Sequence, residues 1–373
     1  MKVLKIDKNN YQVYKGDAEM QDKLDTGVYT LHFQKMMGFY FERREPFAVK
    51  EKLYGDAEHV TDMIINGFEH SERPIGAIFS GNKGLGKSVT CRRLCEKMLN
   101  KGYPVILVNE YIPGIADFID SVEQECIFFF DEFEKAFRKR GDGDIEPQSE
   151  LLPLFDGTNS TTKRLYLVTC NDLRNLDDYL INRPGRFHYH IRERYPNVKE
   201  LHEYLSDKLK PEYQDQISDI LLFSQQIPLN YDCLRSIVFE VNIGNKFRDV
   251  INYMNIMKEG APLYTMEIYF KNGNVVTTQQ YLEMKTREIK TVNVYEVALP
   301  GGSADINVTY TPSKAKYDSK DYTYVLDGED ASYIVTYRYD DQDTKDDDDK
   351  PHYDIERIVF KLSHDSYSNF FKF

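Results

Sequence analysis

Tryptophan is absent from this sequence of 373 residues, and no run of apolar residues approaches the roughly 18 that a membrane-spanning helix requires. We therefore expect no transmembrane segment. The first residues, Met1 to Asp7, lack the long apolar core of a secretory signal peptide. Together these absences favour a protein of the cytoplasm.

Cysteine is scarce, and the odd number and wide spacing of the five residues argue against a disulfide framework. Cys91 and Cys95 would share one helix face, but a metal site would need further ligands that the neighbouring sequence does not offer. We interpret all five as small core residues in a reducing compartment: Cys91, Cys95, Cys126, Cys170 and Cys233.

Positive charge is in deficit, with 48 Lys and Arg against 61 Asp and Glu and a net charge of −13. This balance excludes a globally basic nucleic-acid binder, although it leaves room for a basic channel on one face. The run Arg138-Lys139-Arg140 is open to two interpretations. It is either a contact with nucleic acid or an exposed charged face, including a subunit contact.

The apolar pattern changes along the chain. Residues 1–50 indicate short strands with turns. Residues 51–196 alternate apolar runs with helical stretches, which is typical of a parallel α/β sheet. Helices are expected at 56–68 and 88–99, and strands at 75–80, 105–108, 126–130, 165–169 and 188–191.

The second half of the chain first predicts helices and then strands. Residues 197–260 favour helices, whereas residues 261–373 are acidic and strand-rich, with a hairpin expected on the turn Asn272-Gly273. The charged run Asp346–Lys350 most simply forms a solvated loop, and it also resembles an inserted tag, so we draw no function from it. The predicted helices are 198–209, 214–223, 231–242 and 246–258.

A phosphate-binding motif follows the first strand of the α/β region. Residues 81–88, GNKGLGKS, fit the pattern G-x-x-x-x-G-K-[ST] between a strand and a helix, as the mechanism requires. The glycines let backbone N–H groups surround phosphate oxygens at a helix N-terminus. We expect Lys87 to contact the β- and γ-phosphates and Ser88 to bind Mg²⁺. The predicted nucleotide-binding residues here are Gly81, Gly84, Leu85, Gly86, Lys87, Ser88 and Val89.

An acidic pair supplies the second half of the expected site. The apolar run Phe128-Phe129-Phe130 ends in Asp131-Glu132. We expect Asp131 to hold Mg²⁺ with Ser88, directly or through water. Glu132 would then polarise the attacking water as a general base.

With these two motifs in place, residues 51–258 resemble the AAA+ superfamily of ATPases, in particular its AAA subgroup. Three segments carry the resemblance: 151–157 (LLPLFDG), 167–171 (LVTCN) and 176–187 (LDDYLINRPGRF). They are similar, in order, to a helix end, to a core strand that ends in a polar sensor, and to the "LD..L..RPGR" segment of AAA modules. The resemblance implies a P-loop parallel-sheet core (51–196) with a helical lid (197–260), flanked by the N-terminal β region (1–50) and the C-terminal β-rich domain (261–373).

The resemblance also implies roles for individual residues, with ATP and Mg²⁺ as cofactors. Asn171 would help to position the attacking water. Arg183 and Arg186 match the paired arginines that reach into the neighbouring subunit's site, where a guanidinium stabilises the transferred phosphoryl group. Such fingers require an oligomer, and a hexamer is the form that the resemblance suggests.

Four further residues are candidates on weaker grounds. Tyr54 and Gly55 lie where family members contact adenine. Arg248 departs from the AAA subgroup, whose members commonly lack an arginine as second sensor, yet it could contact nucleotide in that role, which is more typical of DNA-replication AAA+ proteins. Tyr111 is either a pore residue that grips a threaded protein or a packed tyrosine in a turn. The β-rich tail is similar to nothing that we can place, and the whole arrangement resembles phage-encoded AAA ATPases, which would act in the host cytoplasm.

Three functions are compatible with these residues. The first is a motor that remodels a protein or a protein assembly, with Tyr111 or the C-terminal domain selecting the partner. The second is a DNA-replication accessory ATPase, similar to a clamp loader or a helicase loader, which would make nucleic acid the partner. The third is a scaffold that does not hydrolyse ATP, and the intact set of catalytic residues argues against it. No membrane partner is expected.

Overall fold

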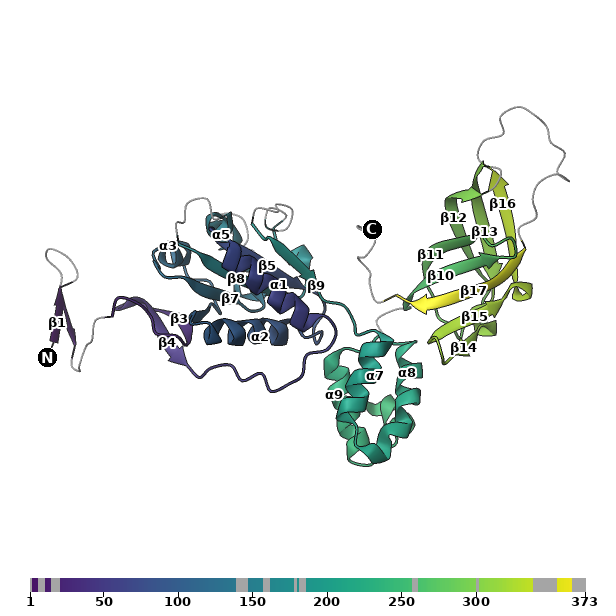
Figure 1. Cartoon of the computed structure of the whole chain (residues 1–373), viewed down its shortest axis with the longest axis horizontal. Coiled ribbons are helices and arrows are strands. Elements are labelled where there is room, and N and C mark those ends of the chain that lie inside the picture. The colour runs from purple at the N-terminus through teal and green to yellow at the C-terminus, as the bar shows by residue number, and fades with distance from the viewer. Residues whose placement is uncertain are drawn as a thin grey trace. The chain divides into compact units, whose positions relative to one another are not determined.

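The computed structural model describes residues 2–5, 11–14, 21–138, 147–156, 162–177, 180, 186–256, 261–299, 302–337 and 354–363. The chain divides into two compact units. The first comprises residues 1–82 and 86–193, and the second comprises residues 83–85 and 194–373. Figure 1 shows their elements in chain order.

The first unit is built on a seven-stranded sheet with the order β4-β3-β6-β7-β8-β5-β9. All neighbours in it are parallel except β3 and β4, which form an antiparallel hairpin. Because β3 pairs with β6, this hairpin is part of the α/β sheet. The apolar pattern predicted that the α/β region begins only at residue 51. The strands are β3 (Val28–Gln34), β4 (Gly38–Arg44), β5 (Ile75–Ser80), β6 (Val105–Leu107), β7 (Cys126–Phe130), β8 (Arg164–Cys170) and β9 (Tyr189–Arg192). A separate pair, β1 (Lys2–Lys5) and β2 (Tyr11–Tyr14), precedes them.

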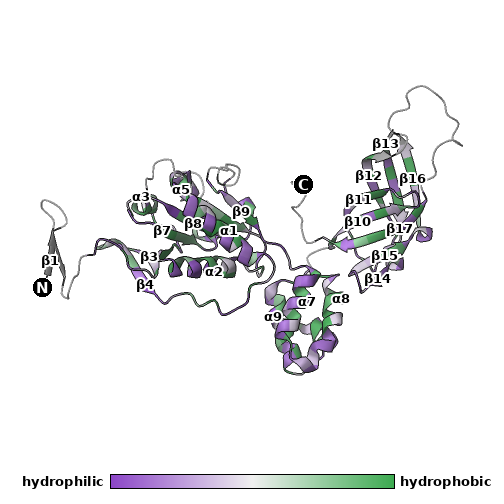
Figure 2. Ribbon diagram, viewed as in Figure 1, coloured by the Kyte–Doolittle hydropathy of each residue, from purple (hydrophilic) through white to green (hydrophobic). Residues whose placement is uncertain are grey.

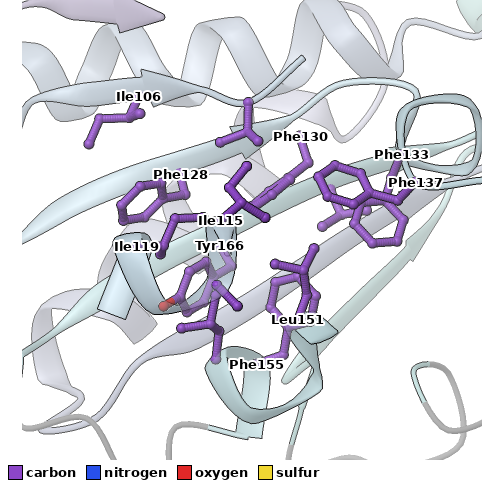
Figure 3. Close-up of a cluster of buried hydrophobic side chains, with 14 of the residues drawn as sticks. Ile106, Ile115, Ile119, Phe128, Phe130, Phe133, Phe137, Leu151, Phe155 and Tyr166 are labelled. Carbon is purple, nitrogen blue, oxygen red and sulfur yellow. The ribbon is translucent and has the colours of Figure 1, made fainter. Parts of the chain in front are cut away.

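Helices cover both faces of this sheet, so its central strands are buried on both sides. Ile127 and Phe129 of β7 pack in one cluster with residues of α1 (Ala57–His70) and α2 (Lys87–Asn100). Phe128 and Phe130 pack in the other with residues of α3 (Ile115–Asp120), α4 (Phe133–Ala136) and α5 (Pro147–Asp156). Figure 3 shows these two rings among the side chains of the second cluster. This two-sided burial explains the uninterrupted apolar sequence of β7.

The second unit begins with helices. Asn197 caps the first of them in a capping box with Glu200, which fixes where that helix starts. Figure 2 shows hydrophilic and hydrophobic residues mixed on α7 and α9, as expected for helices with one buried face. The helix predicted over 246–258 is shorter, because the backbone of Met254 is extended. The helices are α7 (Val198–Lys208), α8 (Ile217–Ser224), α9 (Tyr231–Asn242) and α10 (Phe247–Val250), with short 3-10 turns at Pro211–Gln216 and Ile251–Tyr253.

The unit ends in two antiparallel sheets, with the orders β11-β10-β17-β15-β14 and β12-β13-β16. Buried residues of both sheets form one core. The predicted hairpin is present: Tyr269 pairs with Val275, and Gly273 supplies the positive φ of 87° in the turn. The strands are β10 (Leu263–Phe270), β11 (Val275–Tyr281), β12 (Lys290–Leu299), β13 (Gly302–Tyr310), β14 (Lys316–Asp318), β15 (Thr323–Asp327), β16 (Ala331–Tyr337) and β17 (Ile355–Leu362).

The predicted fold class is thus confirmed: a mixed α/β protein with a parallel core sheet, an N-terminal β hairpin and C-terminal antiparallel sheets. Within the described ranges, no helix has the length and apolar character needed to cross a membrane. The charged run at residues 346–350 lies outside the described residues.

A half-buried histidine of β9 predicts a pH dependence of stability. The Nε2 atom of His190 lies 2.8 Å from the Ser80 hydroxyl. Burial, with a smaller effect of Arg192, lowers the pKa of His190 from 6.5 to about 4. Between these values the unfolded chain binds a proton that the folded chain does not, so acidification through this window removes stability. We therefore expect His190→Gln to lose less thermal stability than the wild type between about pH 7 and about pH 5.

The measurement is the melting temperature at both pH values by circular dichroism. His202, an exposed histidine on α7, provides the control, since His202→Gln should follow the wild type. An equal fall in melting temperature in the wild type and both variants would contradict the assignment of this pH dependence to His190.

Candidate active site

Strand order brings the predicted motifs together. The neighbours β7, β8 and β5 are parallel, so their carboxyl ends meet at one edge of the sheet. Residues 81–88 follow β5, Asp131 and Glu132 follow β7, and Asn171 follows β8. This edge is where ligands bind in open parallel sheets.

The loop after β5 requires glycine. Gly81, Gly84 and Gly86 have φ values of 142°, 75° and 101°, a region that side-chain-bearing residues rarely adopt. A Cβ atom on Gly81 would lie 2.5 Å from the carbonyl oxygen of Glu193. Helix α2 begins at Lys87, so its free N–H groups lie at the end of the loop and form a cradle for an anion.

Lys87 is held inside this loop. Its Nζ donates hydrogen bonds of 2.7 Å to the carbonyl oxygens of Gly81 and Asn82, and only 5% of the residue is exposed. Burial lowers the pKa of Lys87, and the negative charges of Glu193 and Glu134 oppose that shift. The ammonium group is therefore enclosed by oxygen acceptors at the place where phosphate is expected.

Ser88 and Asp131, the predicted metal ligands, are in contact. The Ser88 hydroxyl donates a hydrogen bond of 2.8 Å to Oδ1 of Asp131, so a hydroxyl and a carboxylate oxygen converge. Arg92 lies 3.9 Å from the other carboxylate oxygen. Such hard oxygen donors suit Mg²⁺, which is commonly bound through one or two carboxylates together with substrate phosphates.

Glu132 has an unusual backbone. Its φ of 49° and ψ of 50° lie in the left-handed region, which costs energy for a residue with a side chain. Its N–H donates a hydrogen bond of 2.8 Å to the Thr169 hydroxyl. The carboxylate is 45% exposed, forms a 2.5 Å ion pair with Lys135 and lies 3.4 Å from Nδ2 of Asn171. It is therefore accessible to a water molecule.

The structure adds a carboxylate that the sequence analysis did not single out. Glu134 is 8% exposed, and its Oε1 accepts hydrogen bonds from both the backbone N–H and the side-chain amide of Asn171, at 3.1 and 2.8 Å. Its Oε2 is buried and has no hydrogen-bond partner among the described residues. Burial, and then the charge of Glu134, raises the pKa of the Cys170 thiol to about 12. The sequence signal that could have identified Glu134 is its position as a third acid, two residues after Glu132.

Of the two predicted arginine fingers, the structure describes Arg186. Arg183 lies outside the described residues. Arg186 is only 6% exposed, and its guanidinium bonds both carboxylate oxygens of Asp156, at 2.6 and 3.2 Å. In this chain Arg186 therefore supports the end of α5 from within its own subunit.

The residues predicted by position alone are packed or paired locally. Tyr54 is buried under the Lys52 ammonium, and Gly55 has a φ of 64°. In the second unit, Arg248 is exposed and paired with Asp219 at 2.6 Å. Contacts of Tyr54, Gly55 and Arg248 with nucleotide stay predictions. In the loop, Leu85 is buried and Val89 half-buried.

Tyr111 packs on the core of the first unit. Its hydroxyl donates a 2.5 Å hydrogen bond to Glu150, and its ring meets Phe137 edge to face. The same Glu150 accepts a hydrogen bond from the N–H of Gly114. These are the contacts of a packed tyrosine in a turn, the second of the two interpretations.

Part of the chain matches a known protein family. Residues 77–195 match the model of the family described as "ATPase family associated with various cellular activities (AAA)", so this segment of the chain is an AAA domain. It contains the acidic pair, Asn171 and the phosphate loop from Gly81 to Ser88.

Three relatives illustrate the range. The ATP-dependent zinc metalloprotease FtsH of Mycoplasma genitalium is 27% identical over 161 residues, 38% of this chain and 23% of the relative. The proteasome-associated ATPase of Saccharomonospora viridis is 22% identical over 293 residues, 67% of this chain and 47% of the relative. The mitochondrial inner membrane m-AAA protease component AFG3L2 of Mus musculus is 31% identical over 143 residues, 34% of this chain and 18% of the relative. The chain therefore spans less than half the length of each.

Removal of the loop lysine tests the phosphate site. We expect Lys87→Ala to weaken ATP binding by at least about tenfold, since charge-assisted hydrogen bonds contribute roughly 1.5–3 kcal/mol each. The measurement is titration of a fluorescent ATP analogue. Lys101→Ala is the control, because Lys101 follows α2 and pairs with Glu69 on the surface. Equal affinities of the two variants would contradict the assignment.

Proposed function

We propose that this protein is a Mg²⁺-dependent ATPase that couples hydrolysis to the remodelling of a protein or protein assembly. The observation that carries the proposal is the convergence of Lys87, Asp131, Glu132 and Asn171 at the carboxyl ends of three adjacent strands. A lysine in a glycine-rich loop binds phosphate, and an acidic pair beside it serves a metal ion and a water molecule.

The residues of the loop would bind the triphosphate. Backbone N–H groups at the start of α2 and the ammonium of Lys87 would meet phosphate oxygens, which would replace the carbonyl oxygens of Gly81 and Asn82 as partners of Lys87. Ser88 and Asp131 would hold Mg²⁺, which supplies positive charge to the phosphates when it is bound.

Glu132 would accept a proton from the attacking water. Its Oε1 pairs with Lys135 on the surface, and we expect this exposed ion pair to open in the nucleotide-bound site. Asn171 lies close enough to share a water molecule with Glu132, and Glu134 holds its amide in place.

Substitution of the base separates binding from hydrolysis. We expect Glu132→Gln to bind ATP with near-normal affinity and to lose about 10²–10⁴-fold in turnover, the usual contribution of a general base. Phosphate release is the measurement, with Glu123→Gln as a control on the surface after α3. Near-normal turnover of Glu132→Gln would contradict its role.

We also propose that the active form is an oligomer, with a hexamer as the form that the AAA resemblance suggests. An arginine finger supplied in trans would complete the site from a neighbouring subunit. Because Arg186 already bonds Asp156 in its own chain, Arg183 is the better candidate of the two to reach a neighbour.

Mixing two inactive variants tests the trans arrangement. Arg183→Ala should lose about 10³-fold or more in turnover, as Lys87→Ala should. A mixture of the two should regain part of the turnover, because a subunit that carries the Lys87→Ala substitution still supplies its arginine to the intact phosphate site of its neighbour. A mixture of Arg186→Ala with Lys87→Ala provides the comparison, and we expect this mixture to regain less ATP turnover. A mixture as inactive as its components would contradict the proposal.

The substrate is proposed to be a protein. The relatives are a metalloprotease, a proteasome-associated ATPase and a protease component, and these names connect them with protein degradation. The acidic C-terminal β-rich domain would select the protein partner. The choice is tested by measuring ATP turnover with added unfolded protein, with single-stranded DNA and with double-stranded DNA. Stimulation by DNA alone would favour the replication-accessory function instead.

A further inference from the structure

We propose that Thr169 is a positioning residue that orients Asp131 and Glu132 together, so that one hydroxyl sets both the metal-binding and the water-activating carboxylate. This inference rests on the proposed ATPase function. Thr169 lies near the end of β8, two residues before Asn171, and the motifs described above assign it no role of its own.

The hydroxyl bridges the acidic pair. Oγ1 of Thr169 donates a hydrogen bond of 2.6 Å to Oδ1 of Asp131 and accepts one of 2.8 Å from the N–H of Glu132. One group thus fixes the side chain of the first acid and the backbone of the second. A short hydrogen bond to a carboxylate is among the stronger hydrogen bonds in proteins.

The Thr169 hydroxyl is held in place by the sheet around it. Thr169 is 1% exposed and lies in the middle of the sheet, where it pairs with Phe79 of β5. Its branched Cβ restricts the side-chain rotamer. The position of the hydroxyl is therefore set by the backbone of the sheet, and the acids are oriented relative to a fixed point.

The hydrogen bond from Glu132 to Thr169 would hold Glu132 in its left-handed backbone conformation. A residue with a side chain reaches φ 49° only when its surroundings hold it there. If the Thr169 hydroxyl were absent, the N–H of Glu132 would lose its acceptor, and the residue could relax to a common conformation. Its carboxylate would then leave the neighbourhood of Asn171.

Asp131 would be affected at the same time. Its Oδ1 receives hydrogen bonds from both Ser88 and Thr169. When Ser88 turns to a metal ion, Thr169 is the partner that still fixes the carboxylate. Loss of such an outer hydrogen bond at a metal site typically costs 10–100-fold in metal affinity or activity.

The test compares Thr169→Val, which keeps the branched shape without the hydroxyl, with Thr169→Ser, which keeps the hydroxyl. For Thr169→Val we expect kcat to fall at least about tenfold and the Mg²⁺ concentration for half-maximal turnover to rise several-fold. Binding of a fluorescent ATP analogue without Mg²⁺ should change less than about twofold, because the loop and Lys87 are untouched. Thr169→Ser should stay within about threefold of the wild type in every measurement.

Melting curves identify any variant that fails to fold, and Thr169→Ala, with the same expected kinetics, then replaces Thr169→Val. The inference is overturned if the folded variant without the hydroxyl keeps a normal kcat and Mg²⁺ dependence, or if Thr169→Ser is as impaired as Thr169→Val. Absence of turnover in the wild type is a different result, because it rejects the ATPase function itself.

Discussion

The burial of β7 on both of its faces is the constraint on which the site depends. Four aromatic and aliphatic side chains, from Ile127 to Phe130, anchor the strand between two layers of helices. The chain can become polar only where the strand leaves the core, and Asp131 and Glu132 stand at that point. Each ring of such a strand contributes a few kcal/mol of burial, so the carboxylates are held at a fixed place by a well-packed wall.

Charged groups are dense at this edge of the sheet. Lys87 faces Asp131, Glu134 and Glu193, whose negative charges favour its protonated form against the effect of burial. The Glu134 carboxylate is stabilised by two N–H groups of Asn171 and is left with one buried oxygen that lacks a partner among the described residues.

Much of this arrangement could be predicted from the sequence, since local signals carry it. The loop of residues 81–88 has a pattern typical of phosphate binding, with an apolar strand before it and a helix after it. The hairpin at Gly273 follows from the turn chemistry of Asn-Gly. The pairing of β3 with β6 could not be predicted, because it depends on register between segments that are far apart in the chain.

The same limit applies to the supporting side chains. Thr169 looks like an ordinary strand residue until β8 is placed beside β7, and Glu134 looks like a helix surface charge until Asn171 is placed above it. Arg186 is an informative case, because its motif predicts an arginine that reaches outwards, whereas Asp156, 30 residues earlier, holds it inside. A motif predicts the chemistry of a residue, but its partners are set by the tertiary structure.

The most direct test of the account is phosphate release by the purified wild-type protein with ATP, measured in the presence of Mg²⁺ and again after chelation with EDTA. The account predicts steady turnover with Mg²⁺ that stops when the metal is removed, since Ser88 and Asp131 would then have no ion to hold beside the phosphates. A protein that binds ATP but releases no phosphate in either condition would contradict it.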